Sequence, residues 1–359
     1  MKHGKQIILY ALGYTGIALF TQVVAMWAMY LVWNKGYAVA GSRIFLEKIK
    51  DDRVKRGCRM LDYLRLTVNE IKGLERERTI FLMAVSPVEV HGPHLPVGTD
   101  LFIAEELQRR YVEALQQEYP RHTLVRLPAL FLGADALPVK GSLHFPASLL
   151  KKTLLALAKD LAGQGFRYLF LSDNHGGPRH QLAVESAARR AWEKYCFIMV
   201  NPFGLIFRMM VENDERLFRE TALAPGCCGD NSDSHAGTNE TSLMLAAEPH
   251  REIAGYSEVA AAPPPPAHRG VKALSRLCGF FSGEMGRDLE HLARLLGWIG
   301  DKRMLPYLGA PSKASREKGE AMLRFHVTIA MELFRRALNG EPTPIRPLLW
   351  KLRILQHLP

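Results

Sequence analysis

Histidines and carboxylates occur together at three separate places in the sequence. In the first, Glu89 and His91 stand two residues apart, and Asp100 follows after a turn rich in glycine and proline. Residues two apart on extended backbone point to the same side, and the turn can return Asp100 to them. A carboxylate, an imidazole and a second carboxylate form a ligand set that suits Zn²⁺, Mn²⁺ or Fe²⁺. Taken alone, this cluster could equally be a loop held by hydrogen bonds.

The other two clusters also stand in loops that lead into helices. The second runs from Ser172 to His180 and contains His175, followed by two glycines that let backbone approach a ligand closely. In the third, His235 and Glu240 flank a tight Ala-Gly turn. Core filling does not explain three such clusters at loop positions, so their coincidence predicts a metal site.

The elements that must position these clusters alternate between strands and helices. Apolar runs predict strands at Thr79–Val85, Thr123–Leu127, Arg167–Ser172 and Cys196–Asn201. Helical spacing predicts helices at Asp100–Gln117, Leu149–Ala162, Pro178–Tyr195, Glu240–Ala247, Leu289–Ile299 and Ser312–Leu338. The first of these helices has Thr99 or Asp100 as its expected N-cap. The alternation predicts an α/β domain with a mostly parallel sheet covered on both faces, which binds ligands at the carboxyl edge.

The N-terminal segment has the composition of a transmembrane helix. No charged side chain occurs from Gln6 to Trp33, a length of roughly 28 residues that can span about 30 Å of hydrocarbon. Trp27, Tyr30 and Trp33 cluster at one end, as in an aromatic belt. A buried core helix and a cleaved signal peptide, with Ala38-Val39-Ala40 as its cleavage site, are the alternatives. The apolar run is too long for either, which favours a retained anchor at residues 6–33 in contact with membrane lipid.

The charge distribution suggests how this anchor is oriented. The chain of 359 residues has a net charge of +11, which is compatible with nucleic acid, anionic lipid or an acidic substrate as partner. No nucleic-acid-binding signature accompanies it, so we expect no nucleic acid. Two lysines precede the span and six basic residues follow it, which predicts a catalytic domain in the cytoplasm. The 5 cysteines form no C-x-x-C pair, and an odd number without a framework is typical of a reducing compartment.

In this order the three clusters resemble the motifs of the creatininase (creatinine amidohydrolase) family. The stretch EVHGPHLPVGTD is similar to the family's E-x-H-G-x-H-L-P-x-x-T-D signature, and DNHGGPRH to its N-G-H-G-G-N loop. HAGTNETSLML is similar to the family's H-A-G-x-x-E-T-S-L-M-L segment, and Ala314–Glu320 to the start of its C-terminal helix. The matches extend from about Arg65 to Leu338.

The resemblance implies a three-layer α/β/α domain that hydrolyses a non-peptide C–N bond in an amide, cyclic amide or formamide. It also implies one or two divalent ions, foremost zinc, with manganese or iron as alternatives, and commonly a homo-oligomer. Carried over by position, the metal ligands are Glu89, His91, Asp100 as the bridge between two ions, His175 and, directly or through another ligand, Glu240. His235 takes the place of the acid/base histidine, and Glu240 can take a proton from water. Residues expected around the ligands or facing the substrate are His94, Asn174, Gly176, Gly177 and His180.

Some family residues are replaced. Creatininase proper has a glutamate ligand where this chain has Gly177, and its creatinine-contacting tyrosine and tryptophan are Gly176 and Asn231 here. Asp173 stands where the motif usually has glycine. Creatinine is therefore not the expected substrate. Two alternatives stay open, a membrane-attached scaffold on a retired enzyme fold and a peptidase acting on a short peptide, although a retired site has no physical reason to retain converging charges.

The sequence thus divides into four parts. Residues 1–36 form the expected transmembrane anchor, 37–64 a basic connector, 65–340 the amidohydrolase domain and 341–359 an amphipathic C-terminal tail. The tail could rest on the membrane or pack on the domain. Segments around 203–222 and 268–300 have no recognised counterpart in the family. Within the second, Leu289–Ile299 could serve as a lid, a subunit contact or simple packing.

Overall fold

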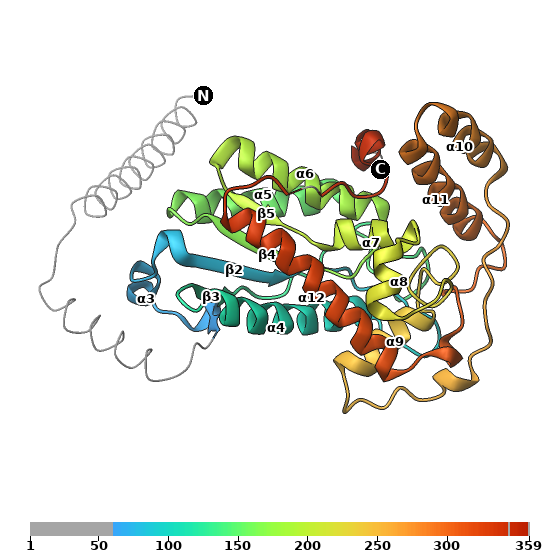
Figure 1. Ribbon diagram of the computed structural model, residues 1–359, viewed down its shortest axis with the longest axis horizontal. Helices are drawn as coiled ribbons and strands as arrows, with labels where there is room; N and C mark the ends of the chain where they lie inside the picture. The colour runs from blue at the N-terminus through green and yellow to red at the C-terminus, as the bar shows by residue number, and fades with distance from the viewer. Residues whose placement is uncertain (1–59, 344, 358–359) are drawn as a thin grey trace, which may run out of the picture. The chain divides into compact units, whose positions relative to one another are not determined.

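Five parallel strands form the sheet at the centre of the described chain (Figure 1). The computed structural model describes residues 60–343 and 345–357. The strands lie in the order β1 (Leu61–Asp62), β3 (Thr123–Arg126), β2 (Thr79–Ala84), β4 (Tyr168–Ser172) and β5 (Ile198–Val200). All neighbouring pairs are parallel. The four expected strands are therefore present, and the short edge strand β1 lies in the segment expected to be a connector.

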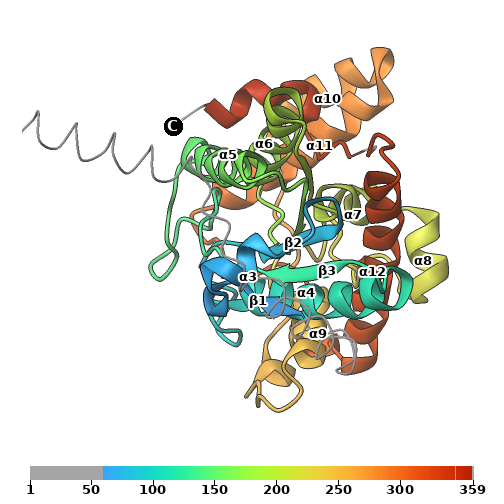
Figure 2. The same cartoon turned by 90° about the vertical axis from the view of Figure 1, so that its left-hand side faces the viewer.

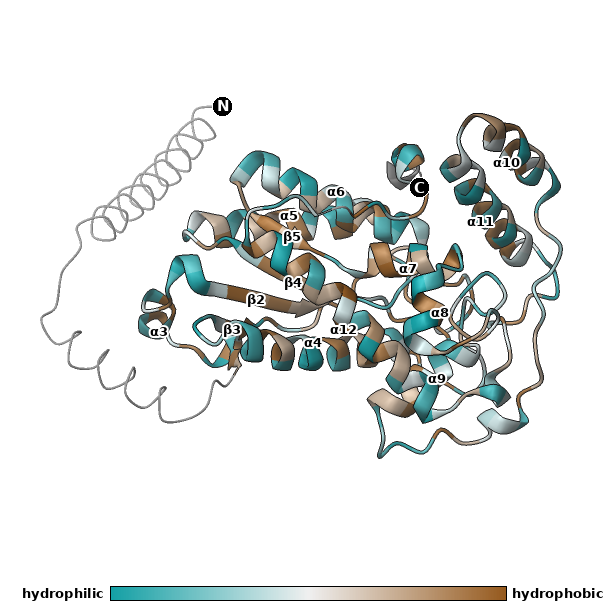
Figure 3. Ribbon diagram, in the orientation of Figure 1, coloured by the Kyte–Doolittle hydropathy of each residue, from teal (hydrophilic) through white to brown (hydrophobic). Residues whose placement is uncertain are grey.

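The central strand β2 is hydrophobic (Figure 3) and buried along its whole length. Its side chains alternate between two hydrophobic clusters. Ile80 and Leu82 face a cluster that includes residues of α4 (Thr99–Glu118) and α12 (Arg316–Leu338). Phe81 and Met83 face a second cluster with α5 (Ala147–Gly163) and α6 (Pro178–Tyr195). Helices therefore cover both faces, as Figure 2 shows, and the domain has the expected three-layer α/β/α architecture.

The remaining helices follow β5 or precede β2. They are α3 (Val68–Lys72), α7 (Phe203–Val211), α8 (Glu215–Thr221), α9 (Thr238–Ala247), α10 (Arg269–Phe281) and α11 (Gly283–Ile299). Single 3₁₀ turns lie at Tyr63–Arg65, Arg76–Arg78, Tyr256–Glu258 and Pro311–Lys313, and a longer, kinked 3₁₀ segment covers Trp350–His357. All six expected helices are present, whereas α3, α7, α8 and α10 were not expected.

The expected N-cap of α4 is wrong. The cap is Gly98, which offers no side chain, and Thr99 is already the first helical residue. The Thr99 hydroxyl donates to the carbonyl of Pro96 at 2.7 Å. This arrangement leaves Asp100 within the first helical turn, with its carboxylate free to face the sheet edge.

Helices α10 and α11 form an antiparallel hairpin at the side of the domain next to α7 (Figure 1). The two helices approach closely at Gly286, where an added Cβ would lie 2.8 Å from the Cα of Gly279. The hairpin is fixed to α7 by a buried ion pair, because Arg208 Nη1 lies 2.9 Å from Asp288 Oδ1. Asp288 Oδ2 also accepts the backbone N–H of Leu349 at 2.9 Å, so part of the C-terminal tail packs on the domain.

Across the residues that the structure describes, no helix combines the length and apolar character needed to cross a bilayer. The anchor expected at residues 6–33 lies outside them, as does most of the basic connector.

Candidate metal centre

Four of the expected ligands meet at the carboxyl edge of the sheet. The loop after β2 carries Glu89 and His91, and the loop after the neighbouring strand β4 carries His175. Asp100 reaches the same place from the first turn of α4. Each of the four is at most 5% exposed. The strand that follows β2 in the chain, β3, lies on one side of β2, and the next strand, β4, lies on the other side. In parallel sheets, such a switch point between β2 and β4 forms a ligand site.

Together with Glu240, these four side chains form two groups that share Asp100. In one group, His175 Nδ1 lies 3.0 Å from Glu89 Oε2 and 3.3 Å from Asp100 Oδ2. In the other, His91 Nε2 lies 3.4 Å from Asp100 Oδ1 and 3.6 Å from Glu240 Oε2. Each group presents two carboxylate oxygens and one imidazole nitrogen within 4.8 Å of one another. The carboxylate of Asp100 thus faces both groups, one with each oxygen.

Hydrogen bonds fix which nitrogen each histidine turns toward the centre. His175 Nε2 lies 2.8 Å from the carbonyl oxygen of Ala134, and His91 Nδ1 lies 3.0 Å from that of Glu89. Because a carbonyl can only accept, these nitrogens carry the proton. The opposite nitrogens, His175 Nδ1 and His91 Nε2, are then free to present lone pairs to a cation when the rings are neutral. A ring N–H held by a backbone carbonyl is the usual support of a metal-ligating histidine.

Several polar atoms of this cluster have no hydrogen-bond donor or acceptor among the described residues. They are Glu89 Oε2, His91 Nε2 and Asp100 Oδ2. Leaving a buried polar group unsatisfied costs about 1–3 kcal/mol, and more when it is charged. These atoms converge on the same small volume, so a divalent cation would satisfy them together. The residues present fit a metal ion.

The electrostatics of the cluster favour positive charge. Although burial lowers it, the carboxylates of Asp100 and Glu240 raise the pKa of His91 to about 10. Burial likewise works against His175, but Glu89 and Asp100 raise its pKa well above the ordinary value. Three buried carboxylates therefore stabilise cationic neighbours here. A metal ion would compete with protons for the same positions.

The third cluster is positioned by Asp233. Its carboxylate accepts the backbone N–H groups of Thr238 at 2.5 Å and Asn239 at 2.9 Å, in the first turn of α9. An acidic side chain at a helix N-terminus satisfies free donors and complements the helix dipole. This contact fixes the helix that carries Glu240, whose Oε2 accepts the N–H of Ala236 at 2.5 Å.

His235 lies over His91, with ring centroids 4.3 Å apart. Its Nε2 donates to the carbonyl of Val90 at 2.9 Å, and its Nδ1 lies 3.9 Å from Glu240 Oε2. Burial and the neighbouring His91 lower the pKa of His235 to about 4, whereas burial raises that of Glu240 to about 7. The pair therefore places a neutral imidazole beside a carboxyl group that can exchange a proton near neutrality.

Asp173 organises the loop that carries His175, a role that the sequence did not reveal. Asp173 is 1% exposed; its Oδ1 accepts from the hydroxyl of Ser86 at 2.9 Å and from the backbone N–H of His175 at 3.0 Å. Its Oδ2 accepts from the side chains of Gln181 and His180. The residue that replaces the motif's glycine is thus a buried carboxylate that connects β2, β4 and α6.

The other expected site residues lie around the ligands. Asn174 Nδ2 donates to Asp100 Oδ1 at 3.2 Å. His180 binds Asp173 at 3.1 Å. His94 lies outside the metal groups and contacts the hydroxyl of Thr241 on α9 at 2.9 Å. These three side chains hold the ligands or the elements that carry them.

The two glycines after His175 are enclosed by other residues. A Cβ added at Gly176 would lie 2.6 Å from the ring of Phe207 on α7. One added at Gly177 would lie 2.3 Å from His175 Nε2 and 2.8 Å from Asp135 Cβ. The space of the family's tyrosine and glutamate is therefore filled from elsewhere in the chain. Phe207 was not expected at the site, because α7 gave no recognisable sequence signal.

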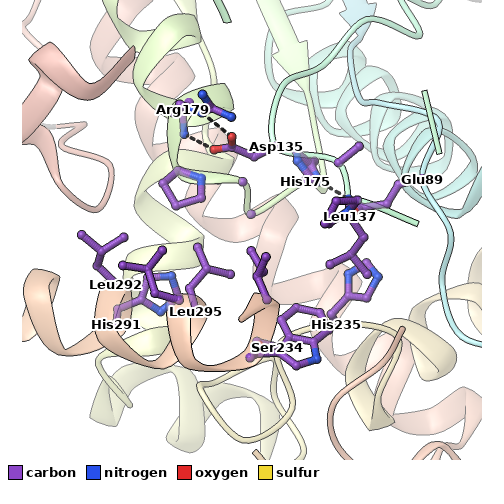
Figure 4. A pocket seen from close by; sticks show the side chains of 18 of the residues that line it. Glu89, Asp135, Leu137, His175, Arg179, Ser234, His235, His291, Leu292 and Leu295 are labelled. Atoms are coloured by element: carbon purple, nitrogen blue, oxygen red, sulfur yellow. Dashed lines mark hydrogen bonds and ion pairs between the residues drawn. The ribbon is translucent and has the colours of Figure 1, made fainter. Parts of the chain in front are cut away.

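A cavity of about 600 Å³ opens onto this centre (Figure 4). Glu89, His175, His235 and Glu240 are among the residues that line it. Arg179 lies at the wall, where its Nε donates to Asp135 Oδ1 at 2.5 Å. On the opposite side the cavity is lined by α11, whose His291, Leu292 and Leu295 face the ligands in Figure 4.

Residues 64–334 match the family model "Creatininase: Creatinine amidohydrolase". This range is most of the chain. The protein therefore belongs to the creatininase family, whose members are hydrolases acting on carbon–nitrogen bonds.

Solved structures of creatininases have the same fold. A structure described as "Creatininase Mn" matches with a TM-score of 0.54 and 19% identity, over 78% of this chain and 99% of that one. A putative creatinine amidohydrolase from Bacteroides fragilis NCTC 9343 matches with a TM-score of 0.53 and 19% identity, over 77% and 96%. A mutant creatininase of the Zn-Zn type matches with 0.52 and 19%, over 78% and 99%. No curated protein sequence matches significantly.

Proposed function

We propose that this protein is a metal-dependent amidohydrolase that cleaves a non-peptide C–N bond with water. The observation that carries the proposal is the pair of ligand groups joined by Asp100, whose unsatisfied atoms Glu89 Oε2, His91 Nε2 and Asp100 Oδ2 converge. A retired scaffold would have no reason to retain these buried groups, because each costs stability without a cation.

The metal is proposed to be one or two divalent ions. Glu89, Asp100 and His175 would hold the first, and His91, Asp100 and Glu240 the second. Mixed nitrogen and oxygen ligands suit zinc, manganese or iron. The names of two similar structures mention manganese and zinc, and we place zinc first.

The chain's own residues supply the proton transfers. A bound ion would lower the pKa of a water molecule and polarise the amide carbonyl. Glu240, beside the centre, accepts the proton of the attacking water. His235, whose Nδ1 lies 3.9 Å from Glu240 Oε2, is proposed to protonate the leaving nitrogen. Its bond to the carbonyl of Val90 holds the ring in the tautomer that leaves Nδ1 available.

Creatinine itself is not the proposed substrate. The positions of the family's tyrosine and glutamate are Gly176 and Gly177, and Phe207 and Asp135 occupy the space that those side chains would need. A peptidase acting on a short peptide would use the same centre, and a substrate screen separates the two activities.

Metal analysis of the purified protein tests the proposal. We expect zinc, manganese or iron bound in at least equimolar amount, together with hydrolysis of a member of a panel of cyclic amides and formamides. Protein that carries no such metal and gains none on incubation would refute it. His91→Ala should lower the metal content, whereas His250→Ala, on the surface, should not.

The N-terminal segment supports a further proposal, that residues 6–33 anchor the protein to a membrane with the catalytic domain on the cytoplasmic side. The uncharged length and the basic residues that follow it support this orientation. A reporter fused after Pro359 should resist external protease in intact cells, and its digestion would reverse the orientation. Association into a homo-oligomer, common in the family, is likewise proposed and is tested by mass measurement of the purified protein.

A further inference from the structure

Helix α11 provides a wall of the cavity, and most of its contributing side chains are apolar. They are Leu292, Leu295, Leu296, Trp298 and Ile299. Other apolar side chains come from separate elements of the fold and are Leu137, Phe145, Phe207 and Leu349. Glu89, His175 and Glu240 of the metal centre line the same cavity. Figure 4 shows Leu292 and Leu295 on the side opposite His175 and Glu89.

The size of the cavity exceeds what a small cyclic amide needs. Pockets of roughly 300–1,000 Å³ bury drug-sized ligands, and this cavity has about 600 Å³. An amide group at the metal centre would leave the volume beside α11 to be filled by another part of the substrate. Water there would face mainly leucine, isoleucine and aromatic side chains, so an apolar group gains by displacing it.

The apolar wall is held in place by several contacts. The ion pair between Arg208 and Asp288 fixes the middle of the hairpin to α7. His291 Nδ1 lies 2.7 Å from Asn231 Oδ1, in the loop before the third cluster. The Trp298 indole N–H donates to the carbonyl of Leu305 at 3.0 Å. These contacts join α11 to three other segments, so the wall is formed before a substrate arrives, which reduces the ordering cost of binding.

From this arrangement we infer that the substrate is an amide carrying an apolar substituent, which lies against α11 while the amide reaches the metal centre. The inference rests on the proposed amidohydrolase function and assigns α11 as its specificity element. In the reaction, one water is consumed. The carbonyl carbon gains the water oxygen, the C–N bond breaks and the nitrogen keeps the bonding pair and gains a proton. The products are a carboxylic acid and an amine.

Alkyl hydroxamates of increasing length test this inference. They carry an amide-like group that chelates metal ions, so the hydroxamate occupies the centre and the alkyl chain probes the wall. The zinc-loaded full chain is titrated with acetohydroxamate, butanohydroxamate and hexanohydroxamate, with free ligand measured in the aqueous phase. Affinity should rise roughly threefold to fourfold per added methylene, which corresponds to about 0.8 kcal/mol of buried CH₂.

Matched variants locate the effect. Leu295→Ala removes apolar surface from the cavity wall and should weaken hexanohydroxamate binding about tenfold while leaving acetohydroxamate unchanged. Leu277→Ala makes the same change on α10, where the side chain is 58% exposed and outside the cavity, and should alter neither affinity. Ile299→Thr, at the 39% exposed rim of the cavity, gives a second test if Leu295→Ala fails to fold.

The outcomes separate this inference from the function on which it rests. If the protein binds zinc and acetohydroxamate but affinity does not grow with chain length, the apolar substrate class is wrong and the amidohydrolase proposal survives. If Leu277→Ala weakens hexanohydroxamate as much as Leu295→Ala does, α11 is not the specificity element. If neither zinc nor any hydroxamate binds, the proposed function itself fails.

Discussion

The Asp100 carboxylate lies against the His175 ring, with Oδ2 3.3 Å from Nδ1, although the two residues follow different strands of the sheet. Its other oxygen, Oδ1, lies 3.4 Å from His91 Nε2. Asp100 therefore belongs both to the group with Glu89 and to the group with Glu240. Substitution of a residue shared by two ligand groups should impair metal binding at both positions, whereas substitution of a residue in a single group should impair it at one.

We expect Asp100→Asn to abolish binding at both positions and His91→Ala to abolish it at one. The asparagine has the size of aspartate but loses the charge that both ions need, whereas His91 contributes to a single Asp100-containing group. Elemental analysis after loading with excess zinc should give up to two ions in the wild type, about one in His91→Ala and almost none in Asp100→Asn. His250→Ala, on the surface, serves as the control. Equal metal content in His91→Ala and Asp100→Asn would contradict the shared role.

Introducing a glutamate at position 177 should damage the centre. An added Cβ would lie 2.3 Å from His175 Nε2 and 2.9 Å from the carbonyl oxygen of Ala134, which are the two atoms of the bond that orients His175. We expect Gly177→Glu and Gly177→Ala to displace the ring, lower the metal content and reduce the free energy of unfolding by about 1–3 kcal/mol or more. Urea unfolding and metal analysis measure both effects.

Gly163→Ala is the matched control for this substitution. An added Cβ at Gly163 meets nothing within 4 Å, so this variant should be as stable as the wild type or slightly more stable. A Gly177→Glu protein with normal stability and more bound metal would show that the loop can open to admit a glutamate ligand.

The meeting of Glu89, His91 and His175 at one edge could be predicted from the sequence because these residues follow the ends of strands. Buried parallel strands read as continuous apolar runs, and their carboxyl ends necessarily share an edge. The helix expected at Pro178–Tyr195 has those bounds, with Pro178 in the first turn and Cys196 in the left-handed conformation at its end. Local signals of this kind are present in the sequence itself.

What the sequence did not predict depends on contacts between distant segments. Helix α10 is an exception, because Val271, Leu274, Leu277 and Phe281 stand at helical spacing in the sequence, although Leu274 and Leu277 stay 48% and 58% exposed. Asp173 gives no sign in the sequence that it gathers donors from Ser86 and Gln181. The same holds for Phe207, which reaches the site only because α7 packs beside it.

Replacing Asp173 by asparagine should weaken metal binding without touching a ligand. The carboxylate accepts hydrogen bonds from the backbone N–H of His175 and from the side-chain N–H of Gln181. The NH₂ group of an asparagine would face one of these N–H groups, and that hydrogen bond would be lost. Substitutions around metal ligands typically cost tenfold to a hundredfold in affinity. Competition with a zinc-binding dye measures this loss.

Asp160→Asn, on the exposed surface of α5, is the control for the change of charge and should retain the wild-type affinity. If Asp173→Asn also retained it, Asp173 would stabilise the fold without positioning His175.

His326 should make the protein sensitive to acid. It is fully buried in α12, and neither ring nitrogen has a hydrogen-bond partner in the described part of the chain. Burial lowers its pKa to about 3. Because this folded-state value lies below the unfolded value of about 6.5, the unfolded chain takes up a proton first as pH falls. Protonation of His326 therefore leaves the free energy of unfolding unchanged above pH ~6.5 and lowers it progressively as pH falls from ~6.5 toward 3.

His326→Leu should therefore remove one source of acid sensitivity. The loss is about 1.4 kcal/mol per pH unit below ~6.5, so at pH 5 the variant should gain about 2 kcal/mol relative to the wild type beyond any difference at pH 8. Urea unfolding of both proteins with a chelator present keeps metal binding out of the comparison. His250→Leu changes an exposed histidine in the same way and should show no such gain. Parallel stability profiles for wild type and His326→Leu would mean that His326 finds a partner or water in solution.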